Sequence, residues 1–170
     1  TKVGCPMSIA AGSGVKGAAD MGRIAGSEAK ALGVTWSFAP VADIDLNFRN
    51  PITNTRTFGS DASLVSDCVS AYVRSCQACG VAASVKQFPG DGCDERDQHL
   101  VASVNDLSVE QWETTYGRIY KRAIDEGVMT IMAGHIMQPA WTRLINPGIK
   151  DEDIMPGSLS KELLQGLLRE

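Results

Sequence analysis

Residues 81–99 read VAASVKQFPGDGCDERDQH, and this stretch decides how the rest of the chain is interpreted. Its first five residues are mostly apolar, which predicts a buried strand. A proline and two glycines follow within residues 88–92, a composition that no strand or helix interior tolerates. Four charged side chains and one histidine then crowd into residues 94–99. A strand that ends in a glycine-rich polar loop is where parallel α/β proteins place their reactive groups.

On either side of this stretch, strand patterns alternate with helix patterns. Apolar residues at helical spacing predict the helices, and capping residues and glycines mark their ends. The predicted elements are, in order, a helix over 17–32 ended by Gly33, a strand over 34–41 buried on both faces, a helix capped by Ser60 or Asp61 and ended by Gly80, a strand over 81–88, a helix opened by the capping box Ser108–Gln111 and ended near Gly127, a strand over 128–136, and a helix over 160–170.

This alternation predicts the α/β class with a parallel sheet. The chain has 170 residues, of which 44% are hydrophobic and 21% charged, as expected for a single domain with a substantial core. Loops 43–57, 86–99 and 135–157 each follow a predicted strand. We therefore expect them to gather at one end of the sheet, where β/α barrels place their active residues.

The central loop offers an acid–base pair. Asp97 and His99 lie two residues apart, so in an extended segment their side chains share one side. A carboxylate beside an imidazole favours its protonated form and can fix its tautomer. His99 is therefore a candidate proton donor, although a chance pairing in a solvated loop is the alternative for this spacing alone.

The longer string resembles a known signature. Lys-x-Phe-Pro-Gly-x-Gly, four residues and then Asp-x-His, over residues 86–99, resembles glycoside hydrolase family 3, most closely its bacterial β-N-acetylhexosaminidase branch. Residues 50–59, NPITNTRTFG, resemble the Asn-Pro…Arg-(Ser/Thr)-Phe-Gly segment of the same branch. The resemblance runs from about residue 10 to residue 170 and implies a parallel (β/α)8 TIM-type barrel. Three strands are too few to close a barrel, so residues 1–170 are expected to be only the middle part of that domain.

The resemblance also implies roles for single residues. The pair Asp97 and His99 would be the general acid/base, and Lys86 and Arg56 would bind sugar hydroxyls. Lys86 could instead be a strand-end lysine reaching solvent, and Arg56 could form a surface salt bridge. A mobile glycine-rich loop would let the acid/base pair reach the glycosidic oxygen.

Three further positions are candidates for substrate binding. Gln87 stands where the family usually has a histidine, and it can hydrogen-bond but cannot carry a charge. Asp43 follows a predicted strand and could contact substrate or cap its own loop. His135 stands where the family often has a histidine near the site, although a buried core histidine is the alternative.

The implied activity is that of a retaining glycosidase. It would remove terminal β-linked N-acetylglucosamine from peptidoglycan or chitin fragments through a covalent glycosyl-enzyme. The alternatives are a β-glucosidase or β-xylosidase of the same family and a non-catalytic sugar-binding barrel fragment. No position in residues 1–170 matches the family's nucleophilic aspartate, so we expect this chain alone to be inactive.

Composition excludes several other classes. The net charge of −4 gives no basic footprint for nucleic acid, and no apolar run approaches the length of a membrane helix. We expect no cofactor and no metal, because Asp91, Asp94, Asp97 and His99 lack the spacing of a calcium loop or a zinc site.

The predicted partner is a small carbohydrate. The predicted location is the cytoplasm, with secretion left open because Thr1 suggests a trimmed start.

Overall fold

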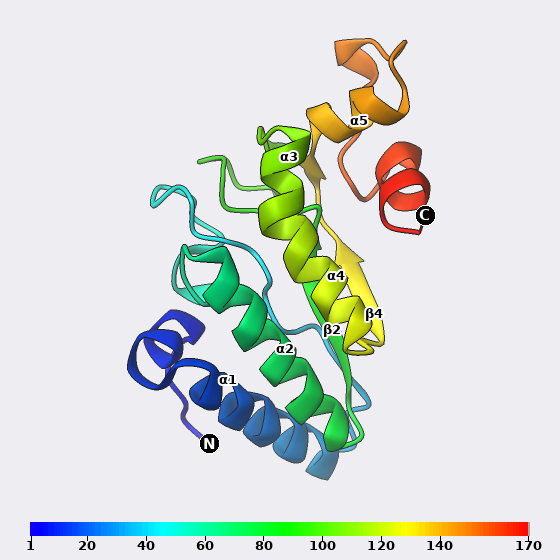
Figure 1. Ribbon diagram of the computed structural model, residues 1–170. Helices are drawn as coiled ribbons and strands as arrows, with labels where there is room; N and C mark the ends of the chain where they lie inside the picture. The colour runs from blue at the N-terminus through cyan, green and yellow to red at the C-terminus, as the bar shows by residue number, and fades with distance from the viewer. Residues whose placement is uncertain (170) are drawn as a thin grey trace.

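A three-stranded parallel sheet forms the centre of the computed structural model, which describes residues 1–169 (Figure 1). Its order is β1-β2-β4, and its strands are β1 (Trp36–Ser37), β2 (Ala82–Phe88) and β4 (Thr130–Ala133). A second, two-stranded parallel sheet pairs β3 (Ser103–Val104) with β5 (Ile136–Met137). The predicted α/β class and the parallel direction of the strands are thus confirmed.

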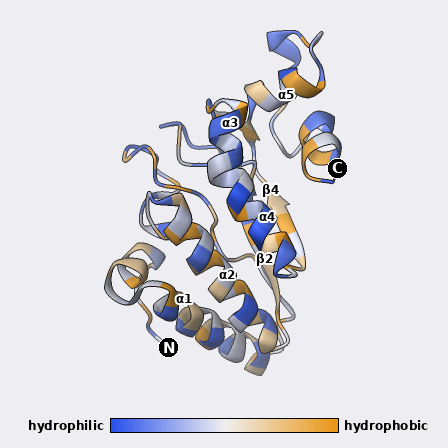
Figure 2. Ribbon diagram, viewed as in Figure 1, coloured by the Kyte–Doolittle hydropathy of each residue, from blue (hydrophilic) through white to orange (hydrophobic). Residues whose placement is uncertain are grey.

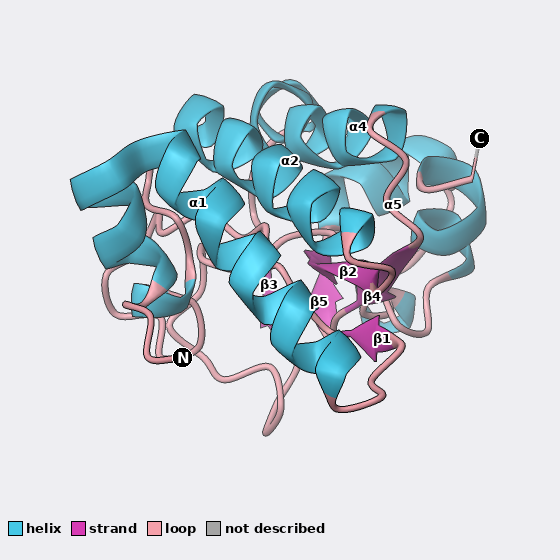
Figure 3. Ribbon diagram, turned by 90° about the horizontal axis from the view of Figure 1, so that it is seen from below, coloured by secondary structure: helices cyan, strands magenta, loops and turns pink. Residues whose placement is uncertain are grey.

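Helices α1, α2 and α4 form a layer over one face of the three-stranded sheet (Figure 3). The helical elements are α1 (Pro6–Ala31), η1 (Asn54–Arg56), α2 (Ala62–Ala78), α3 (Val109–Trp112), η2 (Glu113–Gly117), α4 (Arg118–Asp125), α5 (Pro139–Ile145), η3 (Asp151–Asp153) and η4 (Glu162–Leu167). Of these, η1 and η3 are 3-10 turns, whereas η2 and η4 are π-type segments. No helix within residues 1–169 has the length and apolar character needed to cross a bilayer.

Local capping chemistry sets the helix ends as predicted. The Asp61 carboxylate accepts a hydrogen bond from Leu64 N (2.7 Å) and opens α2. Both halves of the capping box form at the start of α3: Gln111 N donates to Ser108 Oγ (3.2 Å), and Ser108 N donates to Gln111 Oε1 (2.9 Å). The glycines that follow α1, α2 and α4 all have positive φ, as C-terminal caps commonly do.

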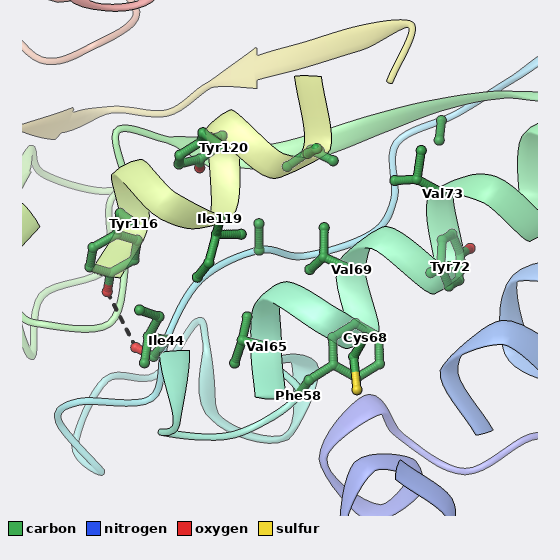
Figure 4. Close-up of a cluster of buried hydrophobic side chains, with 14 of the residues drawn as sticks. Ile44, Phe58, Val65, Cys68, Val69, Tyr72, Val73, Tyr116, Ile119 and Tyr120 are labelled. Carbon is green, nitrogen blue, oxygen red and sulfur yellow. Dashed lines mark hydrogen bonds between the residues drawn. The ribbon is translucent and has the colours of Figure 1, made fainter. Parts of the chain in front are cut away.

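The core lies between this helix layer and the sheet. Figure 4 shows side chains of α2 and of the η2–α4 helix meeting over the chain that leads out of β1. In Figure 2, hydrophilic residues mark the outer side of α3 and α4, and hydrophobic ones mark β4 behind them. The fully buried members include Ile44, Val65, Cys68, Val69, Val73, Cys76, Ala83, Val85, Tyr116, Ile119 and Ala123.

Two glycines let α1 and α2 approach closely. A Cβ at Gly22 would lie 2.5 Å from the carbonyl oxygen of Tyr72, and one at Gly26 would lie 2.9 Å from that of Cys76. Neither position has room for a side chain without separating the helices. The small residues of α1 therefore fix the distance between the first two helices.

Strand β2 agrees with the strand predicted over 81–88, whereas the other two predicted strands are shorter than the sequence indicates. In the segment predicted as a strand over 34–41, only β1 is regular, and Trp36 and Phe38 are 50% and 53% exposed rather than buried on both faces. Pro40 has no N–H, so the ladder cannot continue regularly, although Ser84 N still donates to Ala39 O (2.9 Å).

The predicted strand over 128–136 is broken in two. Gly134 N donates to Phe88 O (2.7 Å), and His135 N donates to the side chain of Gln98 (2.9 Å). The first of these bonds still belongs to the β2–β4 ladder, because Phe88 is the last residue of β2 and pairs with Ala133. The second leaves the ladder for the loop that follows β2. The chain then enters the second sheet as β5.

The two ends of the chain also differ from the prediction. Helix α1 begins at Pro6, well before residue 17, and bends at Gly14 (φ 55°, ψ −143°). A proline at the first helical turn is favourable because its missing N–H has no intrahelical partner there. The predicted last helix is the short segment η4, and Glu170 lies outside the described residues.

Candidate active site

The glycines of the loop after β2 allow contacts that no other residue could make. Gly90 and Gly92 have φ values of +120° and +113°, which favour glycine. A Cβ at Gly90 would lie 2.2 Å from the Tyr116 ring, and one at Gly92 would lie 1.8 Å from Ile44 O. The loop backbone is therefore packed directly against its neighbours.

Side chains from residues 105–116 hold this backbone. Three consecutive loop carbonyls each accept one hydrogen bond: Pro89 O from Trp112 Nε1 (2.7 Å), Gly90 O from Asn105 Nδ2 (3.0 Å) and Asp91 O from the Tyr116 hydroxyl (2.5 Å). All three donors are buried. Figure 4 shows the Tyr116 hydroxyl also directed at Ile44 O, 3.4 Å away.

The buried Asp91 carboxylate links the loops. It accepts hydrogen bonds from Asn50 Nδ2 (2.8 Å), Gln98 Nε2 (2.5 Å) and its neighbour Gly92 N (2.7 Å). Asn50 also donates to Asp94 O (2.7 Å), so this one side chain ties loop 43–57 to loop 86–99 at two points. These donors satisfy Asp91 in the way that a buried charge requires.

Asp43 is buried below the same loop. Its Oδ1 accepts from Gln87 N (3.1 Å) and Asp91 N (2.8 Å), whereas its buried Oδ2 has no hydrogen-bond partner within residues 1–169. Burial, and secondarily the nearby Asp91 carboxylate, raise the pKa of Asp43 to about 7. These contacts go to the backbone of the neighbouring loop 86–99 rather than to Asp43's own loop, and the substrate role stays a prediction.

Asp97 and His99 form a pair at the surface. Asp97 Oδ1 lies 2.8 Å from His99 Nδ1 and also accepts from His99 N (2.9 Å), which closes a local turn. The two side chains are 28% and 55% exposed. These hydrogen bonds from His99, the backbone one first, lower the pKa of Asp97. Because Nδ1 faces the carboxylate, Nε2 is the nitrogen that can reach a substrate.

Arg56 and Lys86 line one cavity of about 210 Å³, together with apolar side chains that include Phe38, Phe58 and Tyr72. Burial, and then the positive charge of Arg56, lower the pKa of Lys86. Arg56 donates to Ile52 O (3.0 Å), and within residues 1–169 neither cation forms an ion pair with a carboxylate. Both can therefore donate to a ligand oxygen.

Comparison with known proteins places this arrangement in a family. The sequence profile of the glycosyl hydrolase family 3 N terminal domain matches residues 1–170. The chain belongs to glycoside hydrolase family 3. It is 55% identical, over its whole length, to a "Beta-N-acetylglucosaminidase/beta-glucosidase" of Cellulomonas fimi, of which it covers 30%.

Solved structures of family 3 members agree with the fold. The chain matches the structure titled "Beta-glucoside phosphorylase BglX bound to 2FGlc" with a TM-score of 0.97 and 53% identity, over 99% of this chain and 30% of that one. It matches a family 3 β-N-acetylglucosaminidase from Paenibacillus sp. str. FPU-7 with a TM-score of 0.86 and 34% identity, over 96% and 30%. The fold is thus part of a TIM-type barrel domain, and the chain spans about 30% of the length of these relatives.

Gln87 and His135, the two positions where family 3 members often have a histidine, differ in their surroundings. Gln87 is buried, its Oε1 has no hydrogen-bond partner within residues 1–169, and its Cβ packs near Gly134. His135 is exposed rather than a core histidine, and its Nδ1 lies 2.7 Å from Ser158 Oγ. Neither side chain contacts the Asp97–His99 pair.

The structure therefore makes two groups of the candidate residues. Asp43, Lys86 and Arg56 lie together at the carboxyl end of β2, and Asp97 with His99 lies beyond the Asp91 carboxylate. Within the described chain, hydrogen bonds through buried side chains, rather than direct contacts, connect the two groups. The sequence analysis missed four residues that hold this loop through hydrogen bonds: Asn50, Gln98, Asn105 and Tyr116. Only Asn50 and Gln98 carried a signal, because both fall inside the family segments.

Proposed function

We propose that the full-length protein carrying this chain is a retaining β-N-acetylglucosaminidase that acts on peptidoglycan or chitin fragments. The single observation that supports this most is the Asp97–His99 pair, bonded at 2.8 Å and exposed beside a rigidly held loop. In a retaining mechanism this pair would be the general acid/base, which protonates the leaving oxygen and then deprotonates water.

The pair's chemistry follows from its geometry. In the first step His99 gives the proton on Nε2 to the departing glycosidic oxygen while a nucleophile bonds to the anomeric carbon. In the second step His99 takes a proton from water, which attacks that carbon and releases the sugar. Asp97 on Nδ1 stabilises the imidazolium that forms. The family's nucleophilic aspartate has no counterpart in residues 1–170, so these residues would supply the acid/base and not the nucleophile.

Arg56 and Lys86 would bind the sugar. Both cations line the cavity at the end of β2, and neither has an ion-paired carboxylate within residues 1–169. Arginine presents a planar fork of donors that suits paired hydroxyl or carbonyl oxygens, and lysine presents a point charge. The carbonyl oxygen of Gln87, buried and without a partner in the described chain, could accept from a sugar hydroxyl or amide.

The test uses His99→Ala in the protein at its full natural length. We expect turnover of a disaccharide to fall by roughly 10²–10⁴-fold, the usual contribution of general acid–base catalysis. Turnover of a nitrophenyl glycoside should fall far less in the bond-breaking step, because nitrophenolate leaves without a proton. Azide should rescue the second step, since a small anion needs no general base to attack the glycosyl-enzyme.

The control is Glu95→Gln, an exposed position on the same loop. It should leave both substrates and the azide response unchanged. If His99→Ala slows both leaving-group classes equally and azide does nothing, His99 only shapes the loop and the acid/base assignment is wrong. A full-length protein that binds the sugar but turns over neither substrate would instead be a non-catalytic sugar-binding member.

A second candidate is action on β-glucosides, including phosphorolysis. The observation that favours it is the 53% identity to the structure titled β-glucoside phosphorylase, together with the two-activity name of the 55% identical relative. Assays with N-acetylglucosaminide and glucoside, each with and without inorganic phosphate, separate the possibilities. Release of the sugar 1-phosphate would identify phosphate as the acceptor, and release of the free sugar would identify water.

A further inference from the structure

The residue between the two members of the acid/base pair has a different environment from either of them. Gln98 is 3% exposed, whereas its neighbours Asp97 and His99 lie at the surface. Both polar atoms of its amide form a hydrogen bond: Nε2 donates to Asp91 Oδ2 (2.5 Å) and Oε1 accepts from His135 N (2.9 Å). The Gln98 side chain thus joins the exposed residues around it to the buried Asp91 carboxylate and to the turn between β4 and β5.

The site around Gln98 is shaped to receive it. Gly134 has no side chain at the point where the amide enters, and a Cβ there would lie 2.8 Å from Gln98 Oε1. That same Cβ would lie 3.1 Å from Gln87 Cβ, so the amide sits next to the family's sugar-binding position. Asp91, which receives Nε2, is held in turn by Asn50.

Few other contacts hold this segment. Within the described chain, the remaining side-chain polar contacts of residues 95–101 go to sequence neighbours, as from Arg96 to Asp94, or to the exposed Arg49, 3.9 Å from Glu95. An exposed pair of that kind contributes about 0–1 kcal/mol. Among residues 95–101, Gln98 is thus the side chain whose polar contacts reach the buried part of the described structure.

We propose that Gln98 is a positioning residue, which sets where His99 meets the glycosidic oxygen by anchoring its segment to Asp91 and to the backbone of His135. This inference rests on the proposed role of His99. It assigns no proton transfer to Gln98, which acts only through its neighbours. A displacement of the reacting group by about 1 Å can cost on the order of 10²-fold in rate.

The first test is Gln98→Ala in the full-length protein, assayed on a disaccharide and on a nitrophenyl glycoside. We expect kcat on the disaccharide to fall roughly 10–10²-fold with KM within about twofold, because binding groups are untouched while the acid is misplaced. The nitrophenyl glycoside should lose much less. Glu95→Gln is the matched control on the same segment. Equal losses on both substrates, or no loss, would overturn the proposal.

The second test keeps the size of the side chain and introduces a charge. Gln98→Glu sets a second carboxyl against Asp91 Oδ2, and two carboxyls this close share one proton. At low pH the shared proton restores the contact, and at higher pH the two charges repel and release the segment. The ratio of variant to wild-type turnover should therefore fall as pH rises. A ratio independent of pH would show that the contact is absent in the working enzyme.

The third test changes Gly134, the residue that packs against the Gln98 amide. Gly134→Ala places a methyl group against Gln98 Oε1 and changes no charge. It should slow disaccharide cleavage in the wild type by more than it does in the Gln98→Ala background, because the contact with Gln98 Oε1 is then gone and only those with Ile136 Cδ1 (2.9 Å) and Gln87 Cβ (3.1 Å) remain. Full additivity would mean that the two residues act separately.

The two proposals fail in different ways. If His99→Ala leaves disaccharide turnover intact, the proposed function is wrong, and the positioning role of Gln98 falls with it. If His99→Ala has its expected effect and Gln98→Ala does not, only the positioning role is wrong.

Discussion

The two halves of the loop after β2 differ in almost every physical respect. In residues 89–94 successive carbonyls, and the Asp91 carboxylate, accept hydrogen bonds from buried side chains. Residues 95–101 lie mostly at the surface, and their charged side chains contact near neighbours in the sequence or the exposed Arg49. The first half is part of the core, and the second half carries the proposed acid and base.

The difference shows how one short loop can meet two opposed requirements. A group that gives a proton to a substrate must be accessible, but its position must be held within a fraction of an ångström. Here the accessible pair stands on a segment whose neighbours on both sides are fixed. Sequence patterns predicted one mobile glycine-rich loop, whereas the contacts divide it into a rigid part and an exposed part.

The largest expected effect comes from breaking the rigid half. Gly92→Ala would put a Cβ 1.8 Å from Ile44 O at a φ of +113°, so the backbone must move. We expect a loss of more than about 3 kcal/mol in the free energy of unfolding, in the range of severe core substitutions. Chemical denaturation measures it.

Gly127→Ala is the matched control for this substitution. Gly127 also has a positive φ, +80°, but a Cβ there would meet nothing within 4 Å. It should therefore cost only the backbone strain of about 1–2 kcal/mol. Similar losses for the two variants would show that the contact with Ile44 is not what holds the loop.

Asp43 gives the second prediction, a pH dependence of stability that originates beneath the rigid half. Its pKa rises from 3.8 to about 7 on folding, so the folded state holds this proton more tightly than the unfolded state. Its contribution to stability is therefore present below pH 4 and is lost as pH rises through about 7. The whole change is at most on the order of 4 kcal/mol.

Asp43→Asn should remove most of that dependence. An amide oxygen can still accept from Gln87 N and Asp91 N, and it does not titrate. We expect the difference in Tm between pH 5 and pH 8 to shrink in this variant. Asp125→Asn, an exposed carboxylate on α4, is the control and should leave the difference unchanged. An Asp43→Asn protein with the wild-type pH dependence would contradict the assignment.

The sequence predicted what depends on near neighbours along the chain. The caps at Asp61 and Ser108 are three residues from their partners, so both helix starts were predicted correctly. The strand predicted over 128–136 was overestimated, because only the fold shows that the backbone N–H of His135 leaves the ladder for the side chain of Gln98.

In the candidate site too, contacts between near neighbours in the sequence could be predicted and long-range contacts could not. The Asp97–His99 contact spans two residues, and the structure forms it. The alternation that puts Asp97 and His99 on one side of the segment puts Gln98 on the other, but nothing in the sequence indicates that its partner there is Asp91. The hydrogen bond from Asn50 to Asp91, which spans 41 residues, could not be inferred either.

The smallest expected effect belongs to Asp97→Asn, which tests charge in the exposed half while keeping its shape. Asp97 Oδ1 accepts from both His99 N and His99 Nδ1, and the backbone donor would hold the oxygen of an introduced amide in the same place. The imidazole would then keep its tautomer and lose only a charge. Because the pair is exposed, we expect the loss of that charge to lower disaccharide turnover by only a few-fold. Asp97→Ala, which also removes the turn, should cost more than Asp97→Asn and less than His99→Ala. If Asp97→Asn proved as damaging as His99→Ala, the carboxylate itself would have to exchange a proton in the reaction, and the division between a reactive histidine and a supporting aspartate would be wrong.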